Sequence, residues 1–161
     1  AFLAAKLLAL LDDKEQLQLI ESLLYIAAGR LHPAATQALC RKLSAQGDHT
    51  AAIQHLLPCA ERGNIECMLD LASNYAQRGS AVDLERCLAW RVEAGMRGHH
   101  ECLKSIILAF ARGDPSLGLR PEKATARTLL LTLQFNNYEG YEAFRASLEA
   151  ELGPTSPAAG R

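Results

Sequence analysis

The chain has 161 residues, of which 49% are hydrophobic, 22% charged and 6% aromatic, and its formal net charge is −1. This composition is ordinary for a globular protein, and the length suits one compact domain or one short repeat array. Because a nearly neutral chain has no overall field that attracts phosphate backbones, we expect no nucleic-acid partner. Alanine and leucine dominate, which favours helix over sheet.

The first 29 residues show two apolar stripes at helical spacing. The first stripe consists of Phe2, Leu3, Leu7, Leu8 and Leu11, and the second of Leu17, Ile20, Leu24 and Ala28. The first is interrupted by Lys6 and is too short to cross a bilayer. We interpret it as a helix packed on the first helix pair of the repeat region; the alternative is the continuation of an upstream membrane or partner helix. Because residue 1 is not methionine, we allow for an upstream signal, anchor or domain.

Helical patterns separated by Gly, Pro and Asn fill the rest of the chain. We predict helices over residues 33–46, 51–62, 65–78, 84–96, 100–112, 122–133 and 139–152. Pro33 suits a first helical turn, whereas Pro58 is expected to kink or shorten its helix. The loop over 113–121 is expected to protrude, and the tail over 153–161 has a flexible composition.

A repeat links two of these helix pairs. Gly63 and Gly98 are 35 residues apart, and the residues that follow them match at the same offset. The matched pairs are Cys67 with Cys102, Leu71 with Ile106, Ala72 with Ile107, and Tyr75 with Phe110. A period of this length is typical of solenoids built from helix pairs, in which no single repeat buries its own apolar face. We therefore predict an all-α, right-handed α-solenoid of antiparallel helix pairs, with about three repeats and flanking helices.

The stretch from Ala60 to Gly98 resembles a Sel-one-like repeat, a relative of the tetratricopeptide repeat. The positions that carry the resemblance are Ala60, Gly63, Leu71, Ala72, Tyr75, Gly79, Val82, Asp83, Arg86, Trp90, Ala94 and Gly98. Cys67, Cys87 and Gly95 stand where the family pattern has alanine. The next unit lacks the Val-Asp turn, and 34–63 is closer to a plain tetratricopeptide unit. The expected organisation is a single domain over 1–152, with flanking helices over 1–29, repeats over 30–135, a last helix over 138–152 and a tail over 153–161.

The resemblance also implies a function. Sel-one-like proteins assemble protein complexes, including membrane-associated ones such as bacterial exopolysaccharide secretion machinery, and they take part in signalling. The expectation is a non-catalytic scaffold or adaptor that binds another protein or peptide. We expect a cytoplasmic location, with or without membrane association, and keep the periplasm as the alternative.

Packing explains most large and small residues of the repeat. We expect Tyr75, Trp90 and Phe110 to be buried between helix layers. The five cysteines fit small-residue positions, since buried free cysteine behaves as a small hydrophobe. We therefore predict that all five are unpaired, which points to a reducing compartment.

Candidate chemistry is sparse. His99, His100 and Cys102 form the one close cluster of metal-capable residues, but Cys102 occupies a repeat core position and no second ligand pair has zinc-site spacing. A helix start with exposed histidines is the simpler interpretation. No active-site motif surrounds any cysteine, and no glycine-rich phosphate loop is present. We expect no enzyme activity, no cofactor and no metal.

The concave face of the array is the candidate binding surface, because first helices line it in related repeats. The residues expected to touch a partner lie between the core positions of these helices: Lys42, Asp70, Asn74 and Ser105. The alternative is a structural or self-association module that forms a homodimer through its N-terminal or C-terminal helices. An exposed apolar face at an array end would indicate the second function.

Overall fold

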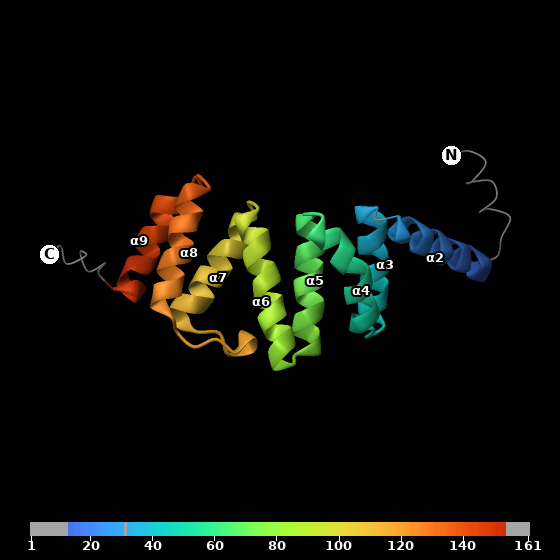
Figure 1. Cartoon of the computed structure of the whole chain (residues 1–161), viewed down its shortest axis with the longest axis horizontal. Helices are drawn as coiled ribbons and strands as arrows, with labels where there is room; N and C mark the ends of the chain where they lie inside the picture. Colours follow the sequence, from blue (N-terminus) through green and yellow to red (C-terminus); the bar gives the residue numbers. More distant parts are fainter. Residues whose placement is uncertain (1–12, 31, 154–161) are drawn as a thin grey trace. The chain divides into compact units, whose positions relative to one another are not determined.

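The computed structural model describes residues 13–30 and 32–153, and over these ranges it is all-helical, with no strand (Figure 1). The α-helices are α2 (Asp13–Gly29), α3 (Pro33–Ala45), α4 (His49–Glu61), α5 (Ile65–Arg78), α6 (Ala81–Met96), α7 (His100–Arg112), α8 (Lys123–Phe135) and α9 (Tyr141–Leu152). A short 3-10 helix, η1, spans Pro115–Leu117. The predicted elements agree with these bounds to within a few residues. The stripe over residues 2–11 and most of the tail lie outside the described residues.

The chain divides into two compact units, Ala1–Asn74 (unit 1) and Tyr75–Arg161 (unit 2), and the division falls within α5. Inside each unit, helices that follow one another in the sequence pack together: α2 on α3 and α3 on α4 in unit 1, then α6 to α9 in chain order in unit 2. The prediction of an all-α fold with neighbouring helices packed in order is confirmed. The right-handed course of the array remains a prediction.

Local signals explain where the helices of unit 1 begin. Pro33 occupies the first turn of α3, as predicted, because its missing N–H needs no partner there. The Asp48 carboxylate accepts a hydrogen bond from the Ala51 amide at 3.0 Å, so α4 begins at His49 rather than at residue 51. Pro58 lies inside α4, and the helix continues past it to Glu61.

In unit 2, α6 begins three residues earlier than predicted because Ser80 caps it and accepts a hydrogen bond from the Asp83 amide at 3.1 Å. The loop after α7 was expected to protrude. Most of its residues are exposed, while Leu117 is buried and η1 contacts α6. Figure 1 shows this loop beside α6. The Glu122 amide also donates to the Phe110 carbonyl, which fixes the end of this loop against α7.

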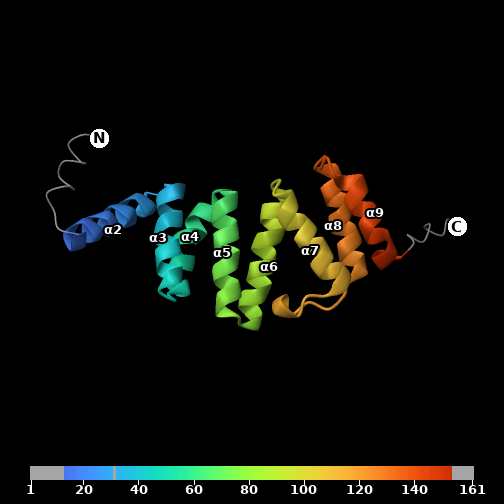
Figure 2. The same ribbon diagram turned by 180° about the vertical axis from the view of Figure 1, so that it is seen from behind.

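Charged side chains attach α9 to the helices before it. Arg112 of α7 makes two hydrogen bonds to the Glu151 carboxylate, at 2.7 and 2.6 Å. Arg127 of α8 donates to the carbonyls of Leu152 and Gly153, where α9 ends. α8 and α9 accordingly lie side by side in Figure 2. This arrangement caps the C-terminal end of unit 2.

Two of the three aromatic residues predicted to be buried are confirmed. Tyr75 and Phe110 have little exposed surface. Trp90 is only partly buried, so the prediction that it fills the space between layers is wrong. Ala94, one turn later on the same face of α6, is fully buried; Trp90 therefore lies on the buried side of α6, but its larger side chain keeps part of its surface in water.

The prediction of five unpaired cysteines is also wrong. Cys59, near the end of α4, and Cys67, in the first turn of α5, form a disulfide with their Cα atoms 6.0 Å apart. Both positions do suit small residues, but the short turn between the helices also brings their side chains together, within the Cα range that a disulfide needs. Cys40, Cys87 and Cys102 are free and buried.

Candidate functional site

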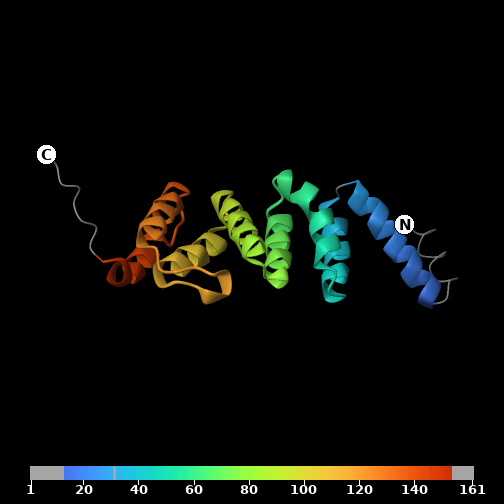
Figure 3. The ribbon, with the colours of Figure 1, turned by 60° about the horizontal axis from the view of Figure 1, so that its bottom comes forward.

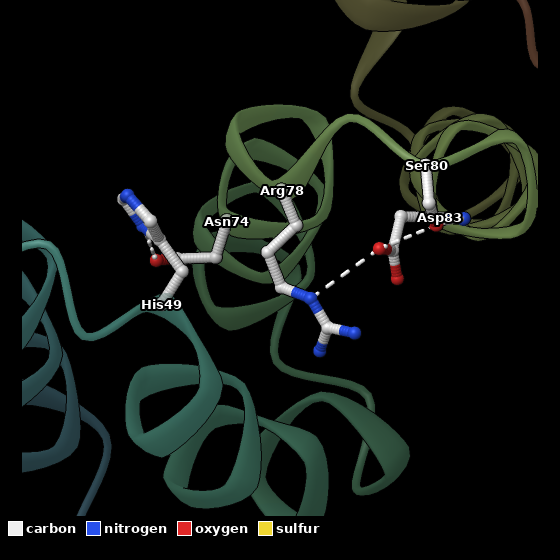
Figure 4. Close-up of polar contacts among 5 residues, drawn as sticks. All are labelled: His49, Asn74, Arg78, Ser80 and Asp83. Atoms are coloured by element: carbon white, nitrogen blue, oxygen red, sulfur yellow. Dashed lines mark hydrogen bonds and ion pairs between the residues drawn. The ribbon is translucent and has the colours of Figure 1, made fainter.

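Asn74, predicted to touch a partner, is buried in unit 1. Its side-chain carbonyl lies 2.7 Å from the Ser44 hydroxyl and 2.9 Å from Nδ1 of His49, both of which can donate to it. Figure 4 shows the contact with His49. Its amide nitrogen donates to the Asp70 carbonyl at 2.8 Å, one turn earlier on α5. Asn74 therefore holds α5 against α3 and the start of α4, and its side chain is not available to a partner.

Asp70 is only partly buried, but its Oδ2 is enclosed and has no hydrogen-bond partner among the described residues. Burial raises the pKa of this carboxyl, while the charge of Arg41 lowers it and that of Glu66 raises it. An enclosed carboxylate oxygen is costly when charged. The folded state therefore disfavours the charged form of Asp70.

The other two residues of the set differ in availability. Lys42 makes an ion pair with Glu21 of α2 at 2.6 Å, so it joins α3 to α2. Ser105 on α7 is exposed, and its hydroxyl donates to the Cys102 carbonyl at 2.9 Å. Ser105 belongs to unit 2 and the other three to unit 1. Within unit 1, hydrogen bonding joins Asp70 and Asn74, and Lys42 faces α2.

The polar side chains at the start of α6, Ser80 and Asp83, stabilise the first turn of the helix. Asp83 is buried; its Oδ2 accepts from the Ser80 hydroxyl at 2.7 Å and pairs with Arg78 at 3.3 Å (Figure 4). Ser80 in turn caps the helix through its contact with the Asp83 amide. This arrangement is a helix start, in which Oδ2 of Asp83 serves both Ser80 and Arg78.

The histidine–cysteine cluster of α7 is used in the same way. Nδ1 of His99 accepts from the Cys102 amide at 3.1 Å, and the Cys102 thiol donates to the Arg91 carbonyl at 3.4 Å. The His100 ring packs edge-on against Tyr138. Among the described residues, no group of three His, Cys, Asp or Glu side chains is placed to hold a metal ion.

The free thiols are poorly suited to nucleophilic chemistry. Burial raises the pKa of Cys40 to about 12, with a smaller contribution from the negative charge of Asp70. Burial also raises the pKa values of Cys87 and Cys102. Since the thiolate is the reactive form, these cysteines stay protonated at neutral pH and act as packing residues.

Lys104 has several partners at the end of unit 2. Its ammonium lies 2.7 Å from the Glu101 carboxylate and 3.0 Å from the Tyr138 hydroxyl. It also stands over the rings of Tyr138 and Phe144, at 5.0 and 5.8 Å from their centroids. These contacts join α7 to α9 and the turn before it, and they leave Lys104 few donors for a ligand.

Two exposed apolar surfaces lie outside the four residues predicted to touch a partner. On α8, Phe135 is 83% exposed and Leu131, one turn earlier, is 53% exposed. On α2, Leu19, Leu23 and Ile26 are all exposed. The signal was present in the sequence: α2 has apolar residues on two faces, whereas a helix at the edge of a core needs only one.

No described helix is long and apolar enough to cross a membrane. Comparison with protein-family models, curated proteins and solved structures found no match. A function therefore has to be argued from the surfaces of the two units.

Proposed function

We propose that this chain is a non-catalytic helical-repeat module that binds a partner protein. The observation that carries the proposal is the exposed apolar pair on α8, Phe135 and Leu131. Phe135 is the last residue of its helix and leaves 83% of its surface in water. Large exposed apolar groups of this kind mark interaction surfaces, and aromatic anchors supply much of the binding energy in interfaces.

A hollow of about 320 Å³ adjoins Phe135 and is lined by Gln134, Phe135 and Asn137. It thus combines an aromatic wall with two side-chain amides. Such amides can donate to or accept from a partner's backbone, while the ring contacts an apolar side chain. The chemistry favours a peptide segment with one apolar anchor and exposed backbone polar groups.

Three of the four polar residues predicted to touch a partner remain in the proposal. Ser105 is exposed, and Lys42 and Asp70 keep part of their surface in water. A partner that reaches Lys42 must compete with Glu21 for its ammonium group. Asn74 is left out because its side chain is buried. In unit 2, Ser105 would then contribute to specificity, with the apolar pair on α8 as anchor; Lys42 and Asp70 would form a separate contact on unit 1.

The resemblance to Sel-one-like repeats suggests where such a module acts. By this resemblance we propose a role as an adaptor in a membrane-associated complex, of which bacterial exopolysaccharide secretion is one example. The Cys59–Cys67 disulfide favours an oxidising compartment, such as the periplasm, over the cytoplasm.

The test compares two aspartate variants that differ only in the surface they charge. Phe135 ends α8, and Met96 ends α6 with 50% of its surface exposed. Purified Phe135→Asp and Met96→Asp chains are used to capture proteins from the native organism, with bound proteins quantified by mass spectrometry. We expect a partner that the wild type and Met96→Asp retain and Phe135→Asp loses at least tenfold.

Equal capture by all three folded chains would remove α8 from the proposal. A further variant, Lys42→Glu with Asp70→Lys, then tests the concave face. If that variant also captures the same proteins, the interaction function itself is contradicted for both surfaces.

A second candidate function, self-association, is favoured by a separate observation, the exposed apolar face of α2.

A further inference from the structure

α2 presents a continuous apolar stripe to solvent. Leu19, Leu23 and Ile26, spaced at i, i+4 and i+7, are 37%, 53% and 57% exposed, with Ser22 beside them. This spacing places all four side chains on one face of the helix. We call these four residues the α2 stripe.

The other side of α2 is already occupied within unit 1. Ala28 is buried, Glu21 pairs with Lys42 of α3, and the Tyr25 ring packs edge-on against His55 of α4. Figures 1 and 3 show that the N-terminal half of α2 extends beyond α3. The α2 stripe is therefore a second apolar face, distinct from the one that holds α2 in the fold.

The chemistry of the stripe excludes charged partners. Between residues 18 and 26, α2 has one charged residue, Glu21, and it is directed to Lys42. A nucleic acid requires basic side chains, and helices that lie on anionic membranes carry Lys and Arg beside their apolar face. The occupant of an uncharged, aliphatic stripe is another uncharged, aliphatic surface.

The order of residues along the stripe makes it complementary to an antiparallel copy of itself. About a two-fold axis between residues 22 and 23, an antiparallel copy of α2 places Leu19 opposite Ile26 and Ser22 opposite Leu23. Each large side chain then meets a large or a small one with no charge between them. We propose that α2 is a homodimerisation helix, whose stripe packs antiparallel on the same stripe of a second copy of this chain.

Two further features fit this arrangement. The Ser22 hydroxyl donates to the Gln18 carbonyl of its own helix at 2.9 Å, so burying it leaves no donor without a partner. The charged residues at the two ends of the stripe have opposite signs, Glu15 and Arg30. Glu15 already has an interaction within its own chain; an antiparallel copy adds the opposite charge of Arg30 near it. An isologous interface requires such self-complementarity.

The size of the stripe sets the strength of the dimer. A standard stable interface buries about 800 Å² on each partner, whereas small interfaces belong to weak, transient complexes. Three aliphatic side chains that are about half exposed belong to the small class. The dimer therefore forms at roughly micromolar concentrations and above.

The first test measures assembly by sedimentation velocity over a thousandfold concentration range. Leu23→Glu places a carboxylate close to its own copy across the axis. Met96→Glu is the matched control, because Met96 on α6 is 50% exposed, close to the 53% of Leu23, and belongs to neither proposed surface. We expect the dimer dissociation constant to rise at least tenfold for Leu23→Glu and to stay within twofold of the wild type for Met96→Glu.

A second test does not depend on a destabilising charge. Leu23→Cys places two thiols close to the proposed axis, and mild oxidation should link them into a covalent dimer. Met96→Cys at the same concentration should form no covalent dimer, because residue 96 lies outside the α2 stripe. Peptide mapping must show a link from residue 23 to residue 23.

Three results would overturn the proposal. A wild type that remains monomeric at every concentration contradicts it directly. A dimer that Leu23→Glu leaves intact uses another surface. Loss of thermal stability in Leu23→Glu without any change in assembly would indicate that the stripe is covered by the chain itself. All three are independent of the α8 surface, so the interaction function stands or falls separately.

Discussion

Reduction of the Cys59–Cys67 disulfide should destabilise unit 1 by an amount that follows from its loop. The two cysteines are separated by 8 positions in the sequence. For a loop of this length, the chain-entropy relation gives a stabilisation of about 2.5 kcal/mol at 25 °C. Since each 1.4 kcal/mol is a factor of ten in an equilibrium constant, the unfolded population should rise about 60-fold on reduction.

Hydrogen exchange followed by mass spectrometry can measure this change peptide by peptide. The slowest amides of α3, α4 and the first half of α5 exchange by unfolding of the unit and should lose up to about 60-fold in protection when a phosphine reductant is added. Peptides from α7 to α9 serve as the internal control, because the free cysteines of unit 2 are already thiols. Alkylation of the unfolded chain should modify three cysteines before reduction and five after it.

Five modifiable thiols without reductant would refute the reasoning at its first step, because no disulfide would then exist. Equal loss of protection in both units would refute the second step, since a loop between Cys59 and Cys67 constrains unit 1. Unchanged protection with a verified disulfide would show that the loop-entropy relation fails here.

Three further predictions concern stability and are tested by thermal or urea unfolding. A Cβ built on Gly95 would lie 2.9 Å from the Cβ of Leu103 and 3.2 Å from its Cα, so Gly95→Ala should cost about 1–3 kcal/mol as an overpacked core does; an unchanged melting temperature would contradict the close approach of α6 and α7. Phe110→Ala should cost about 3–5 kcal/mol because the ring is buried, while Trp90→Ala should cost about half as much because the indole is partly exposed; the reverse order would favour an indole that fills the space between layers. Burial raises the pKa of Asp70, so ionisation of this carboxylate destabilises the folded state above the folded pKa, and this penalty vanishes below the unfolded pKa. Asp70→Asn should therefore stabilise unit 1 at pH 7 and have little effect on its stability at pH 3. Equal effects at both pH values would exclude a charge penalty.

The fold was largely predictable because a single repeat period fixes many residues together. Leu71, Ala72 and Ile106 are all fully or almost fully buried, as their matched positions require. The same reasoning failed for Trp90, which matches the family pattern but keeps part of its surface exposed. A repeat pattern states which positions are equivalent, and the degree of burial depends on neighbours that the pattern does not contain.

The candidate site was less predictable because a polar residue on a helix can either contact a partner or form hydrogen bonds inside the fold. Asn74 lies between core positions in the repeat, which predicted exposure. In the structure, Ser44 and His49 both approach its side-chain oxygen. Neither belongs to the repeat signature, since they lie at the end of α3 and the start of α4, where the spacing is altered. A buried amide of this kind is recognised only when its donors are known.

The disulfide also shows that equivalent repeat positions can differ in their neighbours. Cys67 and Cys102 occupy equivalent positions, yet only Cys67 is bonded, because Cys59 faces it from α4 while Ala94 occupies the corresponding place on α6. Equivalence within the repeat predicted the burial of both cysteines correctly and their chemistry incorrectly. What differs between repeats is where this chain departs from its own pattern: a disulfide in unit 1, an apolar stripe on α2, and an exposed Phe135 on α8. Packing within a repeat requires none of these three features. The disulfide is therefore the place to test the redox state of the chain, and the α2 stripe and Phe135 are the places to test its interactions.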